Sequence, residues 1–178
     1  MIFTIGHSNR SIGDFMAMLE SFDIQTLVDV RAIPQSRYNP QFSLIDLSAT
    51  LNEAKIMYVP MKSLGGKREA RANSINTAFR SDGFRGYADY MQTEEFAAAI
   101  DMLIDLSEQS ATAMMCAEAD TARCHRALVS DALLARDIAV RHILGVDRFL
   151  VHGLTETARV QGRTVSYPAP ESAQKSLF

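Results

Sequence analysis

A buried strand, a polar loop and a helix are predicted in residues 111–136, which read ATAMMCAEADTARCHRALVSDALLAR. The apolar run 111–116 predicts the strand, and the spacing of apolar residues predicts the helix from about residue 122 to residue 136. The same order of strand and then helix recurs on both sides of this stretch. Short apolar strands that alternate with helices predict an α/β fold.

The remaining elements predict a largely parallel sheet of about five strands flanked by helices. Four more strands are expected at 2–6, 26–30, 56–59 and 140–144, with shorter strand-like pieces at 149–151 and 164–167. Helices are expected to begin at Ser11, to span 44–53, to follow Thr93, and to form briefly around 69–78. A chain of 178 residues, 47% of them hydrophobic, suffices for one domain, which we expect to span residues 1–168.

The composition excludes several classes of protein. No apolar run approaches the ~18 residues that a membrane-spanning helix needs. The first residues lack the basic and apolar regions of a signal peptide. Two cysteines cannot build a disulfide framework, so a cytoplasmic location is expected. The net charge of −3 does not by itself draw the chain to nucleic acid.

Reactive and charged side chains gather where the predicted strands end. In open α/β sheets, ligands bind beyond the carboxyl ends of the strands. Three predicted strand ends carry such groups: His7 with Ser8, Asp29 with Arg31, and Cys116 with Glu118. The quoted loop then reaches Cys124 and His125, which we expect in the first turn of the helix. Backbone N–H groups and the helix dipole favour an anion or a thiolate there.

Two chemistries fit these residues directly. An anion or nucleotide could be bound by Ser8, Arg31, Arg37, Arg123 and Arg126. Acid–base, nucleophilic or redox catalysis would use His7, Asp29, Cys116, Glu118, Cys124 and His125. Each residue also has a structural interpretation, because either cysteine could be a core residue and Asp29 with Arg31 could be a structural ion pair.

A metal site is a third possibility. Cys116, Glu118, Cys124 and His125, with His7 as a further candidate, could supply the four ligands of a tetrahedral zinc ion. The spacing C-x7-C-H lacks the close pairing that zinc-binding cysteines usually show. The sequence therefore does not predict a metal, and it identifies no other cofactor.

A basic segment lies between Val30 and Ala88, with nine Lys or Arg against four Asp or Glu. Basic residues interleaved with aromatic ones can neutralise phosphates and stack on bases. The candidates for nucleic-acid contact are Lys62, Lys67, Arg68, Arg71, Arg80 and Arg85. The alternative is a solvated loop whose aromatic residues anchor it to the core.

Several of these motifs occur together in one known family. They are Thr4-Ile5-Gly6-His7-Ser8, Val28-Asp29-Val30-Arg31, Pro34, Ser36-Arg37, Pro40-Gln41-Phe42, Leu64-Gly65-Gly66, Met115-Cys116-Ala117-Glu118 and Cys124-His125-Arg126. With them, the chain resembles the domain-of-unknown-function 488 family of mostly bacterial proteins over most of residues 2–170. The family has no established reaction, so the resemblance implies a shared site without naming its chemistry.

The last residues suggest a partner. We expect residues 169–178 to be a flexible tail, because prolines flank small residues at its start. Its end, Gln174-Lys175-Ser176-Leu177-Phe178, resembles the bacterial sliding-clamp-binding peptide Q-L-[SD]-L-F, with Lys175 in place of an apolar residue. Leu177 and Phe178 would fill an apolar pocket of the DNA sliding clamp, and Gln174 would bond at its rim. Alternatively, the two apolar residues fold back onto their own domain.

Three functions follow as hypotheses. The first is a DNA-associated protein, such as a nucleic-acid-processing or repair enzyme, that the sliding clamp recruits and whose strand-end site binds an anion or nucleotide. The second is a stand-alone enzyme or binding protein for a small anionic metabolite. The third is a non-catalytic adaptor that joins the clamp to other proteins. No membrane partner is expected, and the sequence leaves the oligomeric state open.

Overall fold

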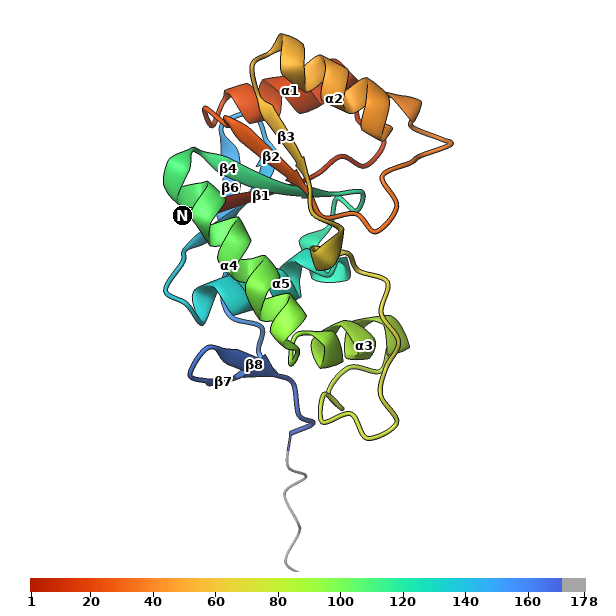
Figure 1. Ribbon diagram of the computed structural model, residues 1–178, viewed down its shortest axis with the longest axis vertical. Helices are drawn as coiled ribbons and strands as arrows, with labels where there is room; N and C mark the ends of the chain where they lie inside the picture. Colours follow the sequence, from red (N-terminus) through yellow and green to blue (C-terminus); the bar gives the residue numbers. More distant parts are fainter. Residues whose placement is uncertain (171–178) are drawn as a thin grey trace, which may run out of the picture.

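A six-stranded sheet forms the centre of the structure, a computed structural model that describes residues 1–170 (Figure 1). The strand order is β3-β2-β4-β1-β5-β6. Five of these strands are parallel, and β6 alone runs antiparallel at one edge. The strands are β1 (Ile2–Gly6), β2 (Thr26–Asp29), β3 (Met57–Pro60), β4 (Thr112–Cys116), β5 (Val140–Gly145) and β6 (Arg148–Val151).

Helices cover both faces of the sheet, as the prediction of an α/β domain requires. One face carries α1 (Ile12–Glu20) and α2 (Leu44–Glu53). The other carries α3 (Asp82–Tyr90), α4 (Glu94–Gln109) and α5 (Arg126–Leu134), as Figure 1 shows. A small hairpin of β7 (Arg159–Gln161) and β8 (Thr164–Ser166) extends the second layer. Within residues 1–170, no helix is long and apolar enough to span a membrane.

The two layers follow from the alternation of side chains along the buried strands. In β1, Ile2 packs with the α3, α4 and α5 layer, whereas Phe3 and Ile5 pack with α1 and α2. Successive side chains of a strand point to opposite faces, so an apolar strand supplies both cores at once. The sheet thus holds two separate apolar clusters, one on each face.

Local sequence signals set several helix ends as predicted. The hydroxyl oxygen of Ser11 accepts a hydrogen bond from the backbone N–H of Asp14 at the start of α1. Thr93 caps α4 in the same way, by accepting from the N–H of Phe96. Such caps satisfy N–H groups that have no partner within the helix. The expected bounds of α2 agree with the structure, and those of the strands agree within two residues.

The helix expected around 69–78 is wrong, and a helix that the sequence did not predict, α3, follows this segment instead. The carboxylate of Asp89, on α3, accepts hydrogen bonds from the backbone N–H of Arg71 and from the side chains of Ser74 and Asn76. These long-range bonds hold the segment as a loop against α3. A local reading of the sequence has no access to them.

The helix after β4 also begins later than expected. A 3₁₀ turn at Thr121–Arg123, capped by Asp120, replaces its first turn, and Cys124 is extended. The α-helix proper starts at Arg126, with His125 as its N-cap residue. Placing Cys124 and His125 in the first helical turn was therefore wrong, because His125 is the N-cap residue and Cys124 precedes it.

The strand order creates a crevice between β1 and β4. These two strands are neighbours, yet the chain leaves β1 toward α1 on one face and leaves β4 toward α5 on the other. Where connections part to opposite faces, the carboxyl ends of two parallel strands leave a gap that commonly binds ligands. His7 and Ser8 follow β1 at this gap, and Cys116 ends β4.

Gly6 lets the loop after β4 cross over the end of β1. A Cβ atom at this position would overlap the backbone carbonyl of Glu118 and lie 2.8 Å from Cα of Ala119. We expect Gly6→Ala to lower the free energy of unfolding by about 1–3 kcal/mol, because the clash is with backbone. Gly13→Ala is the matched control, since only the Ser11 hydroxyl lies near, at 3.9 Å. It should leave stability unchanged or slightly raised in urea denaturation; equal effects of the two variants would contradict the crossing constraint.

Candidate functional site

The crevice between β1 and β4 is closed at its base by hydrogen bonds that continue the strand pairing. The backbone N–H of His7 donates to the carbonyl of Cys116 at 3.0 Å, and that of Ser8 donates to the carbonyl of Ala117 at 2.8 Å. Ser8 has a φ of +50°, a left-handed conformation that turns the chain toward α1. The two loops after β1 and β4 therefore run side by side along the crevice.

Two cavities meet at this point. The larger, of about 680 Å³, is lined by residues from the loops after β1, β2 and β4, and the smaller, of about 560 Å³, extends toward α3. The residues common to both linings are Ser8, Gly66, Cys116, Ala117 and His125. Each volume is within the range of small-ligand sites. The shared border is thus the place where a bound molecule would meet a thiol and an imidazole.

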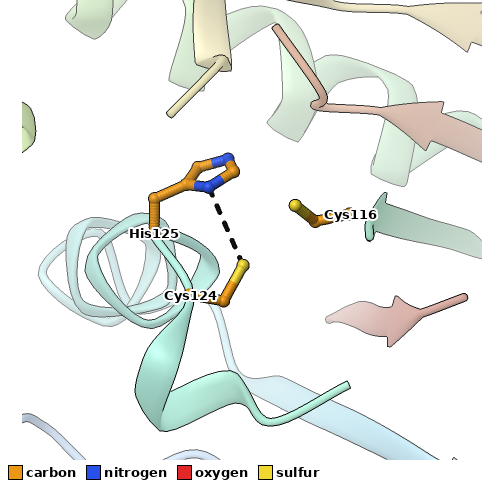
Figure 2. A group of neighbouring side chains, drawn as sticks. All are labelled: Cys116, Cys124 and His125. Carbon is orange, nitrogen blue, oxygen red and sulfur yellow. Dashed lines mark hydrogen bonds between the residues drawn. The ribbon is translucent and has the colours of Figure 1, made fainter. Parts of the chain in front are cut away.

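Cys116, Cys124 and His125 converge there, as Figure 2 shows. One donor atom from each side chain lies within 4.8 Å of the other two, and Cys124 Sγ is 3.7 Å from His125 Nδ1. Cys124 is buried. Cys116 and His125 are half-buried, and each of them lines both cavities. Two thiols and an imidazole are a donor set that could hold a thiophilic cation such as Zn²⁺.

The backbone fixes how His125 is oriented. Its Nε2 lies 3.2 Å from the carbonyl oxygen of Val30, which can only accept a hydrogen bond, so Nε2 carries the proton. In the neutral ring, Nδ1 then presents a lone pair toward the two sulfur atoms. The carbonyl of Val30, at the end of β2, thus sets the tautomer of His125, which precedes α5.

The two thiols have opposite protonation preferences. Hydrogen bonding with Cys116, together with the charge of Arg126, lowers the pKa of Cys124 to about 3, although burial opposes this shift. Bonding to Cys124 and burial raise the pKa of Cys116 well above its usual value. Within the pair, the thiolate form is thus favoured at Cys124 and the thiol form at Cys116. Arg126 Nε donates a hydrogen bond to Cys124 Sγ, at 3.3 Å.

Arg126 supports the site from inside the protein. Its side chain is among the largest that are fully buried, and its guanidinium donates to Cys124 Sγ and to the carbonyl of Glu118. It therefore holds the loop after β4 against the start of α5. The sequence suggested Arg126 as an anion ligand, but in the structure its guanidinium bonds inward to the protein.

Asp29 and Arg31 form a buried ion pair behind the site. Arg31 donates to both carboxylate oxygens of Asp29, at 2.9 Å from Nε and 2.6 Å from Nη2, and Tyr58 donates to the same carboxylate. Arg31 also donates to the carbonyl of Phe42 at 2.8 Å. This is the structural alternative that the sequence left open. Removing one partner of such a pair typically costs about 3–5 kcal/mol.

His7 is buried beside this ion pair. Its ring stacks on Phe42 with centroids 4.3 Å apart, and its Nδ1 donates to the carbonyl of Ser8. Burial lowers the pKa of His7 to about 4, and the charge of Arg31 acts in the same direction. Its Nε2 accepts from Arg31 at 3.3 Å. His7 is thus neutral and lines the larger cavity.

The other candidates occupy different surroundings. Glu118 and Arg123 line the smaller cavity, and Lys67 lines the larger one. Arg37 is exposed and lines neither. The remaining basic residues that the sequence suggested for nucleic-acid contact do not form one patch with Lys67. Arg68, Arg71 and Arg85 line a separate hollow of about 550 Å³ that also contains Glu69 and Asp82, Lys62 lines a further hollow, and Arg80 is exposed.

A second polar network was missed by the sequence reasoning. Thr4 donates to His142 Nδ1 at 2.8 Å, His142 Nε2 lies 3.0 Å from His152 Nδ1, and His152 Nε2 donates to Asp131 at 2.9 Å. Tyr167 donates to the second oxygen of the same carboxylate. A histidine inside the apolar strand 140–144 was the available signal. The network connects β1, β5 and α5 beneath the site.

The fold and the site together define a class: a doubly wound α/β protein whose candidate site lies at the switch point of its sheet, between β1 and β4. The family described as Domain of unknown function DUF488 matches residues 11–133, which include Cys116, Cys124 and His125. The chain belongs to this family. No curated protein and no solved structure matches the chain.

The buried histidine network predicts a pH-dependent stability. Burial lowers the pKa of His142 to about 4, below the unfolded value of 6.5, so the folded protein binds fewer protons between these two values. Stability is full above pH 6.5 and falls on acidification. At pH 5, His142 alone should cost about 2 kcal/mol of unfolding free energy relative to pH 7.

Urea denaturation of the wild type and of His142→Gln at pH 5, 7 and 8 measures this contribution. The variant should lose about 2 kcal/mol less than the wild type between pH 7 and pH 5. Between pH 7 and pH 8 the difference between the two proteins should stay constant. An equal acid dependence in both proteins would show that His142 does not titrate in this way.

Proposed function

We propose that this protein is an enzyme that binds a small anionic substrate in the larger cavity and transforms it beside Cys116 and His125. The observation that carries this proposal is the lining of the 680 Å³ cavity, which contains the basic residues Arg31 and Lys67 and no acidic residue. This is the second of the functions that the sequence suggested. The volume suits a metabolite rather than a polymer.

The charges around the cavity favour an anion. Arg31 is bound to Asp29, but Lys67 on one rim and Arg123 on the rim of the adjoining cavity are exposed. Neither of these two residues forms an ion pair in the described part of the chain. A cationic side chain that is not paired within the protein is available to a phosphate or carboxylate group. The rims can therefore hold an anion while its far end reaches the shared border.

The polar groups in the cavity lining can orient such a substrate. The Ser8 side chain is half-buried at the turn after β1, and Asn9, Ser36 and Asn39 add further hydrogen-bonding groups to the lining. A few converging polar groups in a mainly apolar cavity are typical of small-molecule sites. Substrate orientation would come from these groups, and reactivity would come from the thiol and imidazole at the border.

A thermal-shift screen with phosphate- and carboxylate-bearing metabolites, including free nucleotides, tests the proposal. At least one such anion should raise the melting temperature, and Lys67→Met should weaken its binding roughly 10- to 100-fold, because a charge-assisted hydrogen bond is lost. Lys55→Met is the control, since Lys55 is exposed and precedes β3 at the amino end of the sheet. If no anion stabilises the protein, or if Lys55→Met weakens binding as much as Lys67→Met, the proposal fails.

Recruitment to DNA by the sliding clamp is the second candidate function. It rests on the sequence Gln174-Lys175-Ser176-Leu177-Phe178, whose residues lie outside the described part of the chain. The hollow lined by Arg68, Arg71 and Arg85 carries three basic residues against two acidic ones, Glu69 and Asp82, and its arginines could contact phosphates.

Binding of the full chain to a bacterial sliding clamp tests the second candidate. The double variant Leu177→Ala with Phe178→Ala should weaken the complex by at least about 2 kcal/mol, or roughly 30-fold in Kd, because two apolar anchors are removed. The control pair Glu171→Ala with Ser172→Ala changes the same segment outside the pentapeptide and should bind as the wild type does. A wild-type chain with no measurable clamp affinity would falsify this candidate.

A further inference from the structure

Cys116, Cys124 and His125 surround a single point at the border of the two cavities (Figure 2). We propose that their Sγ, Sγ and Nδ1 atoms bind one Zn²⁺ ion, with a fourth coordination position open toward the substrate cavity. This inference goes beyond the proposed function in naming a cofactor. The binding of the ion stands on its own, whereas its part in catalysis rests on the proposed function.

The geometry suits a tetrahedral ion. With Zn–S bonds of about 2.3 Å and Zn–N bonds of about 2.0–2.1 Å, neighbouring ligand atoms of a tetrahedral site are about 3.6–3.8 Å apart. Cys124 Sγ and His125 Nδ1 are 3.7 Å apart, and all three donor atoms lie within 4.8 Å of one another. Small rotations of the side chains would bring Cys116 to the same spacing. Two thiolates and one imidazole are established zinc ligands.

The surroundings of the ligands match those of bound metals. A ligating histidine usually donates its other N–H to a carboxylate or a backbone carbonyl, and His125 Nε2 faces the carbonyl of Val30 at 3.2 Å. Arg126 Nε donates to Cys124 Sγ, a hydrogen bond that tempers the charge on a metal-bound thiolate. Both partners are set by the fold, because Val30 follows β2 and Arg126 begins α5.

Gly66 leaves room for the imidazole of the ligand histidine. A Cβ atom on Gly66 would lie 2.6 Å from His125 Nδ1 and 3.0 Å from Cγ of the same ring, closer than atoms without a bond approach each other. Any side chain at this position would therefore press on the ring and displace it. Gly66 thus lets His125 keep the position in which Nδ1 faces the two sulfur atoms.

The charges balance when the ion is bound. Both cysteines bind as thiolates, and any proton that a thiol still carries is released to solvent, so two thiolates neutralise Zn²⁺. Three protein ligands with one open position are the arrangement of catalytic rather than structural zinc sites. Because Cys116 and His125 line both cavities, the open position faces the space where the anion would bind. The ion would there polarise an oxygen atom of the substrate or a water molecule.

Metal analysis of the full chain, expressed with zinc and purified under reducing, anaerobic conditions, tests the inference. One equivalent of Zn²⁺ should co-purify with each chain. After the metal is stripped, Co²⁺ should give thiolate-to-cobalt charge-transfer absorption and the intense visible bands of a tetrahedral site. No retained zinc and no such absorption would overturn the proposal, as would a Cys116–Cys124 disulfide in the freshly purified protein.

Ligand variants assign the site to its residues. Cys116→Ser, Cys124→Ser and His125→Gln should each raise the Kd for Zn²⁺ by at least about 100-fold, because loss of an outer partner alone costs 10- to 100-fold. Gly66→Ala should weaken binding by crowding Nδ1. Ligand variants that bind Zn²⁺ as the wild type does would overturn the proposal, and if a variant does not fold, the wild-type cobalt spectrum decides.

Lys67→Met separates this inference from the proposed function. It should leave the Kd for Zn²⁺ unchanged while it weakens anion binding. If the wild type binds Zn²⁺ but no anion stabilises the protein, the proposed substrate class fails and the metal site stands. If anions bind through Lys67 and no metal binds, the metal site fails alone.

Discussion

The pairing of β1 with β4 beyond their ends is the constraint on which the site depends. The N–H groups of His7 and Ser8 bond to the carbonyls of Cys116 and Ala117, so the two strand ends are held together where their helices part to opposite faces. Gly6 permits the crossing, because only a residue without Cβ fits beneath Glu118. This contact places Cys116 opposite the turn after β1 and opens the cavities between the loops.

Buried polar groups support the site more than they react in it. Asp29, Arg31 and Tyr58 bond to one another, and Arg126 bonds inward to Cys124 and Glu118. Inside a protein, an unpaired charge is far costlier than a paired one, so these groups satisfy each other. The residues that line the cavities include Cys116 with its thiol, His125 with its imidazole, and the exposed basic residues Lys67 and Arg123.

Much of the site could be predicted as a set of residues, but not as an arrangement. The strand-end argument found Cys116, Cys124 and His125, because parallel strands bring their carboxyl ends to one edge. The C-x7-C-H spacing argued against a metal, yet the 3₁₀ turn at Thr121–Arg123 and the extended Cys124 fold the intervening loop so that the donor atoms meet. Spacing rules assume a standard loop, and this loop is shaped by contacts with Gly6 and Arg126.

The sequence by itself determined the α/β class, the five parallel strands and several helix ends, because apolar periodicity and capping side chains act over a few residues. Only the tertiary structure decided that residues 69–78 are a loop, that α3 exists, and that Thr4, His142, His152 and Asp131 form one buried network. It also decided which polar residues bond to one another and which face the cavities. These outcomes depend on hydrogen bonds between segments distant in the chain, and such bonds leave no periodic signal in the sequence.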